Sequence, residues 1–243
     1  MDGADVEIET DEGPMTTFVV GPDDDGPHPV VVFLMDAPGK RPLLHDMARR
    51  LAGHGYRVLL PNLYHRVTDA FELDPTDEAS FARMTELMRG VGNAMAGRDV
   101  GAVLAWADDD PLADASRVGL VGYCMSGPFA VWSAAEHADR VRAAASFYGV
   151  RLHTDRHYSP HRRLGEITGE LYVGAAEHDD WISLDEVDRF EAGLQRTEVA
   201  GRVERYWGCH HGFAFADRPV HDEAADRRHV AALLDLFERN LAS

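Results

Sequence analysis

The chain has few cysteines, with only Cys124 and Cys209 among its 243 residues. A lone disulfide is unusual in a reducing compartment, so we expect both to be free thiols. No apolar run approaches the roughly 20 residues that span a bilayer, which argues against a membrane protein. The first residues, MDGADVEIETDEG, lack the basic start and apolar core of a secretory signal. We therefore expect a cytoplasmic protein without a membrane partner.

Basic residues are also scarce. The chain has 24 of them against 42 acidic residues, a formal net charge of -18. Such an excess repels phosphate backbones and argues against a nucleic-acid partner. The composition, 45% hydrophobic and 27% charged, is ordinary for a soluble globular protein. The length suits one sizeable core, so we predict a single domain over residues 1–243.

Apolar runs alternate with segments of helical period, a pattern typical of an α/β protein with a largely parallel sheet of about eight strands. The predicted strands cover residues 6–10, 15–20, 29–35, 56–61, 117–123, 142–149, 170–176 and 202–208. The predicted helices cover residues 42–54, 77–95, 99–107, 126–137, 184–194 and 220–241. We expect the first strands to be antiparallel. Two long excursions, residues 62–97 and 149–169, are candidate pocket walls.

One of the two cysteines lies in the turn between a predicted strand and a predicted helix, in the sequence GLVGYCMSG. Cys124 has the small residues Gly122 and Ser126 two positions away on each side, as a sharp turn with a strained central residue requires. The amino terminus of the following helix favours a thiolate. A buried, inert cysteine is the alternative, but the strand-turn-helix context predicts a nucleophile. Ser126 is a weaker candidate because Pro128 follows it.

A nucleophile of this kind needs a base, and the base needs an orienting acid later in the chain. Asp179 and Asp180 follow one predicted strand, and His210 and His211 follow the next. Carboxyl ends of neighbouring parallel strands meet at one edge of a sheet. We predict Asp179 as the acid and His211 as the base, with His210 and Asp180 as the alternatives.

In this order, the segments PVVVFLMDAPG, HGYRVLLPNLYHR, GYCMSG, AEHDDWIS and HHGF resemble the dienelactone hydrolase family of α/β-hydrolases. The resemblance spans most of the chain, and GYCMSG is its most specific part. It implies the α/β-hydrolase fold and a hydrolase of ester, lactone or thioester bonds with a Cys124, His211 and Asp179 triad. It also implies a covalent acyl-enzyme and an oxyanion hole formed by the N–H groups of Met125 and Ala37.

The sequence departs from the family pattern at two places. Where the family has a glutamate near the thiol, this chain has Asp36, which is one methylene shorter. It is either an auxiliary acid near the thiol or a hydrogen-bonding loop residue. The family's arginines that hold a substrate carboxylate are missing, with Phe215 at one position and residues 79–81 at the other. We therefore expect a larger or less charged substrate than the small anionic lactone.

Aromatic residues near the strand ends are candidate substrate contacts; these are Tyr64, Tyr148, Trp181 and Phe213. His153, His157 and His161 have a helical metal-ligand spacing, but Pro160 argues against a helix, so we expect neither metal nor cofactor. The substrate is expected to be a small ester or lactone, and the protein a monomer or homodimer. Two alternatives remain: a thiol redox sensor that uses Cys124 and Cys209, and a cyclase or lyase with the same pocket.

Overall fold

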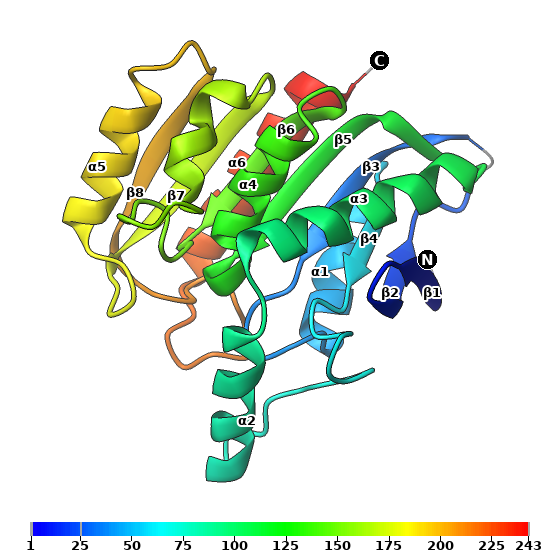
Figure 1. Cartoon of the computed structure of the whole chain (residues 1–243), viewed down its shortest axis with the longest axis horizontal. Coiled ribbons are helices and arrows are strands. Elements are labelled where there is room, and N and C mark those ends of the chain that lie inside the picture. Colours follow the sequence, from blue (N-terminus) through cyan, green and yellow to red (C-terminus); the bar gives the residue numbers. More distant parts are fainter. Residues whose placement is uncertain (1, 25, 243) are drawn as a thin grey trace.

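A computed structural model describes residues 2–24 and 26–242. Eight strands form one sheet in the order β1-β2-β4-β3-β5-β6-β7-β8, as Figure 1 shows. The strands are β1 (Ala4–Thr10), β2 (Gly13–Val20), β3 (His28–Leu34), β4 (Arg57–Pro61), β5 (Ala113–Tyr123), β6 (Val141–Phe147), β7 (Glu170–His178) and β8 (Gly201–His210). Each coincides with a predicted strand to within a few residues. The prediction of an α/β-hydrolase fold is confirmed.

The sheet is antiparallel only at its beginning. β1 pairs with β2, and β2 pairs with β4, in antiparallel register, as expected. From β4 through β8 every pairing is parallel. The carboxyl ends of β3, β5, β7 and β8 therefore lie along one edge of the sheet, where loops carry functional groups.

Helices cover both faces of the sheet (Figure 1). α3, α4 and α5 pack on one face, and α1 and α6 pack on the other. The helices are α1 (Pro42–Ala52), α2 (Glu78–Arg89), α3 (Asn93–Asp109), α4 (Gly127–Glu136), α5 (Leu184–Leu194) and α6 (Glu223–Leu241). Short 3-10 turns cover Cys124–Ser126 and Pro160–Glu166. The core strand β3 is buried on both faces, which explains its unbroken run of valine, phenylalanine and leucine.

The predicted boundary between the helices at residues 77–95 and 99–107 is wrong. The break lies at residues 90–92. α2 ends at Arg89, and Gly90 is its C-cap. α3 begins four residues later, at Asn93, after Gly92 in an extended conformation. Gly90 and Gly92 flank the break, and glycine's low helix propensity explains why the chain turns there.

α2 extends away from the rest of the molecule (Figure 1). Leu87 is its only buried residue, and Phe81 is exposed. None of the helices within residues 2–24 and 26–242 has the length and apolar character needed to cross a membrane. Both cysteines are free thiols, as expected.

Candidate active site

Cys124 follows β5 directly and has a positive φ of 54°. This left-handed conformation is costly for a residue with a side chain, so the surroundings must hold it in place. A Cβ on Gly122 would lie 2.2 Å from the main-chain oxygen of Ser126, so the turn is possible only with glycine there. The predicted strained elbow is present, and it leaves the Cys124 side chain partly exposed at the carboxyl edge of the sheet.

The last residues of β7 and β8 bring the acid and the histidine together. His178 pairs with His210 in the sheet register, and the His211 N–H donates to the His178 carbonyl at 3.0 Å. One residue further on, His211 Nδ1 lies 2.7 Å from Asp179 Oδ2. The other Asp179 oxygen accepts the N–H groups of Trp181 at 2.9 Å and Ile182 at 3.3 Å. These bonds fix the orientation of the carboxylate, whose side chain is only 1% exposed.

Asp179 binds Nδ1 and leaves His211 Nε2 as the nitrogen that can exchange a proton. Nε2 is buried and has no hydrogen-bond partner among the described residues. Burial lowers the pKa of His211, but the Asp179 carboxylate and the nearby Cys124 sulfur outweigh it and raise the pKa to about 9. The thiol therefore lies close enough to interact with the imidazole, although the two do not form a hydrogen bond of standard geometry.

The alternative residues are placed differently. His210 is exposed and its ring lies 4.8 Å from the ring of His178. Asp180 is exposed. The Ser126 hydroxyl is fully buried, accepts the Tyr123 N–H at 2.9 Å and donates to the Leu34 carbonyl at 3.0 Å. Ser126 thus stabilises the turn and is not available to attack a substrate.

Asp36, which follows β3, is fully buried and bound by two arginines. Arg41 donates to its two oxygens at 2.5 and 3.4 Å, and Arg218 donates at 3.1 Å. Burial raises the pKa of Asp36, whereas both guanidinium charges oppose the rise. Three hydrogen bonds from two cations favour the carboxylate. Asp36 is thus a buried ion-pair residue.

Arg41 also donates to Asp217 at 2.7 Å. Burial lowers the pKa of Arg41, but the charge of Asp36 and the bond to Asp217 raise it overall. Arg41 and Arg218 are thus neutralised by two acids. Arg83, close in sequence to residues 79–81, lies on α2 and binds Glu86 at 2.7 Å.

The four aromatic residues predicted to contact the substrate differ in their exposure. Trp181 is 67% exposed. Phe213 is fully buried, stacks on Tyr206 at 4.6 Å and meets the ring of Tyr148 at 5.2 Å. Its ring fills the core between these two tyrosines, and its role as a substrate contact stays a prediction. Tyr64 and Tyr148 are each 1% exposed.

The hydroxyls of the two buried tyrosines differ in their hydrogen bonding. Tyr64 Oη donates to the Ala37 carbonyl at 2.8 Å and lies 3.4 Å from Met125 Sδ. Tyr148 Oη has no hydrogen-bond partner in the described part of the chain. The ring of Tyr148 lies edge-on to His211 at 5.1 Å, and its φ is 38°. Ala37 and Met125, the two predicted oxyanion-hole residues, therefore meet around Tyr64.

No group of three or more potential metal ligands is present in residues 2–24 and 26–242. The rings of His153 and His161 stack at 3.8 Å, and His161 Nδ1 lies 2.7 Å from Ser159 Oγ. A cavity of about 420 Å³ lies at the amino-terminal edge of the sheet and is lined by residues that include Pro29, Tyr56 and Leu241. Neither Cys124 nor His211 lines this cavity.

A sheet of this topology with a cysteine elbow after β5, an acid after β7 and a histidine after β8 defines an α/β-hydrolase. The model of the dienelactone hydrolase family matches residues 15–241. The chain belongs to this family and is a hydrolase that acts on lactone or ester bonds.

Individual relatives support the assignment to this family. A Synechocystis protein named "Putative carboxymethylenebutenolidase" is 28% identical over 222 residues, which cover 89% of this chain and 88% of that protein. The carboxymethylenebutenolidase of Rhodococcus opacus is 28% identical over 223 residues, with 90% and 84% covered. The crystal structure named "Putative Dienelactone Hydrolase" from Klebsiella pneumoniae superposes with a TM-score of 0.86 at 24% identity, covering 98% of each chain. This last likeness concerns the fold.

Sequence patterns did not identify Arg41 or Asp217 as neighbours of the site. Arg41 reaches Asp217 across 176 residues of sequence, and no local spacing indicates such a contact. The sequence held one weak indication of such a contact. Asp36 follows a buried strand, and a buried carboxylate requires a cationic partner.

Proposed function

We propose that this hydrolase works through a Cys124, His211 and Asp179 triad and a covalent acyl-enzyme. One observation carries the proposal: the His211–Asp179 hydrogen bond of 2.7 Å lies beside a cysteine with a positive φ at the strand-to-helix turn. Acyl transfer of this kind requires a nucleophile next to a base and an acid that orients the base.

In the first step Cys124 attacks as the thiolate, with its proton on His211 Nε2, and its Sγ forms a bond to the carbonyl carbon. The N–H groups of Met125 and Ala37 bind the resulting oxyanion. The bond to the leaving oxygen then breaks as His211 donates the proton to that oxygen. Water attacks the thioester, gives a proton to His211, and releases the acid as the carbon–sulfur bond breaks and Cys124 is regenerated.

The charges around the site favour a neutral substrate. Arg41 and Arg218 are held by Asp36 and Asp217, and Phe215 is buried under the Arg41 guanidinium, 5.2 Å from it. A carboxylate would therefore compete with two acids already in place. The lactones that carboxymethylenebutenolidases are named for carry such a carboxylate. We propose an uncharged ester, lactone or thioester for this chain.

Tyr148 supplies a spare hydrogen-bond donor. Burial raises its pKa far above the usual value, so the hydroxyl stays protonated. A buried hydroxyl without a partner costs free energy, which a substrate oxygen would recover. We assign the Tyr148 hydroxyl to substrate binding beside His211.

Substitution of the nucleophile tests the proposal. Cys124→Ala should lose at least about 1,000-fold in kcat for a neutral activated ester, because no covalent step remains. Cys124→Ser keeps the shape of the side chain and should retain a small residual rate. Thermal unfolding of both variants shows whether the fold is intact. Full hydrolysis by Cys124→Ala would contradict the mechanism.

The redox alternative requires Cys209 to resolve an oxidised Cys124. Burial raises the pKa of Cys209, which leaves less thiolate for such an attack. The alternative also gives no role to the His211–Asp179 pair. Mass spectrometry after mild peroxide treatment distinguishes the two, because only the redox alternative requires a disulfide between residues 124 and 209.

A further inference from the structure

Residues 62–73 form a loop that lies against the chain segment after β3, which carries Ala37. The loop contacts this segment at three consecutive residues. Tyr64 Oη donates to the Ala37 carbonyl at 2.8 Å, and the Leu73 N–H donates to the Pro38 carbonyl at 2.9 Å. A Cβ on the next residue, Gly39, would lie 1.9 Å from the Phe71 carbonyl oxygen. The loop therefore fixes the backbone on the carboxyl side of Ala37.

The Tyr64 hydroxyl also connects the two residues whose N–H groups bind the oxyanion in the proposed mechanism. It lies 3.4 Å from Met125 Sδ in addition to its bond to Ala37. A hydroxyl has one hydrogen, and the carbonyl is the better acceptor, so the sulfur contact is the weaker one. Burial raises the pKa of Tyr64 and keeps that hydrogen in place. A single buried side chain thus spans from the end of β3 to the elbow after β5.

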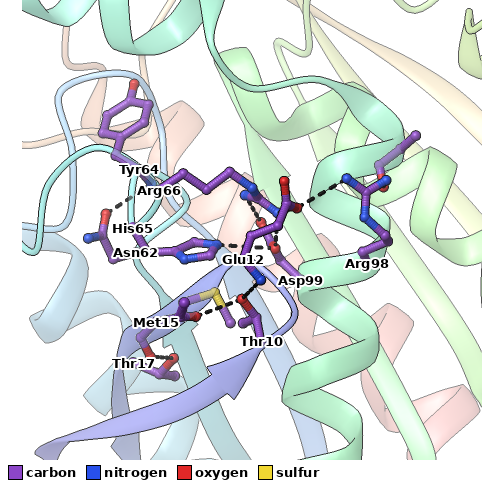
Figure 2. Close-up of polar contacts among 12 residues, drawn as sticks. Thr10, Glu12, Met15, Thr17, Asn62, Tyr64, His65, Arg66, Arg98 and Asp99 are labelled. Carbon is purple, nitrogen blue, oxygen red and sulfur yellow. Dashed lines mark hydrogen bonds and ion pairs between the residues drawn. The ribbon is translucent and has the colours of Figure 1, made fainter.

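The base of the loop is closed by Asn62. Its Nδ2 donates to the carbonyls of Thr68 at 2.8 Å and Asp69 at 3.1 Å. Its Oδ1 accepts the N–H of Tyr64 at 3.0 Å, as Figure 2 shows. All three bonds stay within the loop, so Asn62 holds Tyr64 at a fixed place on it.

An ion cluster joins the loop to the rest of the fold (Figure 2). Arg66 binds both oxygens of Asp99 on α3, at 2.9 and 2.7 Å, and Glu12 in the turn between β1 and β2 at 2.7 Å. His65 Nε2 lies 3.3 Å from Asp99. The Asp99 side chain is 1% exposed, and a two-point guanidinium bond to a buried carboxylate is strong and directional.

We propose that Tyr64 is a positioning residue for the oxyanion hole and that the Asp99–Arg66 pair anchors it. The proposal rests on the proposed function, because it requires Ala37 and Met125 to bind the oxyanion. Tyr64 touches no reacting atom. It sets the separation of two N–H groups, and a donor displaced by about 1 Å can cost 100-fold in rate.

The test is to compare acylation with alkylation of the same thiol. Tyr64→Phe removes only the hydroxyl, and should slow acylation by an activated nitrophenyl ester about 10- to 100-fold with little change in KM. Alkylation of Cys124 by iodoacetamide forms no oxyanion, so its rate should stay at the wild-type value. Tyr172→Phe is the matched control: it also removes a buried, hydrogen-bonded hydroxyl, here one bound to Glu204 at 2.8 Å. It should keep both rates.

Wild-type acylation in Tyr64→Phe, or an equal loss of acylation and alkylation, would overturn the proposal. Activity that survives in Cys124→Ala would instead contradict the proposed function, so the two failures are distinguishable. A second variant tests the anchor. Asp99→Asn should reduce acylation several-fold with alkylation unchanged. Asp110→Asn, which weakens the comparable Arg57–Asp110 pair of 2.8 Å, should leave acylation at the wild-type rate.

Discussion

At the residue scale, the His211 imidazole has a pKa raised above its ordinary value. Asp179 and the Cys124 sulfur raise its pKa to about 9, so below that pH it holds a proton that it can donate to a leaving group. An alkoxide leaving group needs this proton, whereas nitrophenolate does not. We expect kcat/KM for an alkyl ester to fall above pH 9 more steeply than for a nitrophenyl ester. A pH profile with both substrates measures this.

Asp179→Asn provides the control. Without the carboxylate the pKa of His211 should move down toward its ordinary value near 6.5, and the fall in alkyl-ester hydrolysis should move to lower pH with it. Identical profiles for the two esters, or a fall that stays at the same pH in the variant, would contradict the assignment of His211 as the acid.

A second residue-scale prediction concerns Asp36. Asp36→Ala leaves Arg41 buried with one of its two carboxylates removed, and should reduce the free energy of unfolding by about 3 to 5 kcal/mol. Asp46→Ala removes an exposed partner of Arg49 and should cost about 1 kcal/mol or less. Denaturant unfolding compares the two, and similar costs would show that the buried cluster contributes little to stability.

Only some of the contacts at the site could be predicted from the sequence. The contact between Asp179 and His211 was predictable because each follows a strand, and neighbouring parallel strands bring their ends together. The pairing of Asp36 with Arg41 and Arg218 was not predictable. Arg218 lies 182 residues away in the sequence, and its contact depends on how the loop after β8 folds back over the end of β3.

At the scale of elements, the elbow depends on one glycine. Gly122→Ala would place a Cβ 2.2 Å from the Ser126 carbonyl oxygen, an atom of the main chain that cannot move independently. The turn must then open, and we expect at least about 100-fold loss of kcat because Cys124 is displaced. Gly165→Ala, where a Cβ meets nothing within 4 Å, should keep full activity. Equal activity in the two variants would contradict the steric account.

Strands were easier to predict than helix boundaries. Central strands such as β3 and β4 are short apolar runs delimited by polar segments, and all eight strands were found. The break between α2 and α3 was misplaced because their helical periodicity continues across residues 90–92, while the backbone turns at Gly90 and Gly92. A weak apolar face on α2, with only Leu87 buried, gave no packing signal to correct the boundary.

At the scale of the whole molecule, the net charge of -18 acts on every substrate that approaches. It should repel anions over about a Debye length, and salt should weaken that repulsion. We expect kcat/KM for an anionic nitrophenyl ester, the hemisuccinate, to rise as ionic strength increases from about 0.01 to about 0.15 M. The neutral acetate should show no such change. A hemisuccinate rate that falls with salt would reveal a cationic binding site and contradict the proposed preference for uncharged substrates.

The covalent intermediate gives the most direct test of the central claim, that Cys124 attacks the substrate carbonyl. Wild-type protein is mixed with a neutral nitrophenyl ester, quenched in acid during turnover, digested and analysed by mass spectrometry. The account predicts one acyl group, carried by the peptide that contains Cys124, and no adduct in Cys124→Ala. Two results would contradict it. One is an acyl group on another residue; the other is a His211→Ala variant that turns over the ester but shows no adduct after the same acid quench.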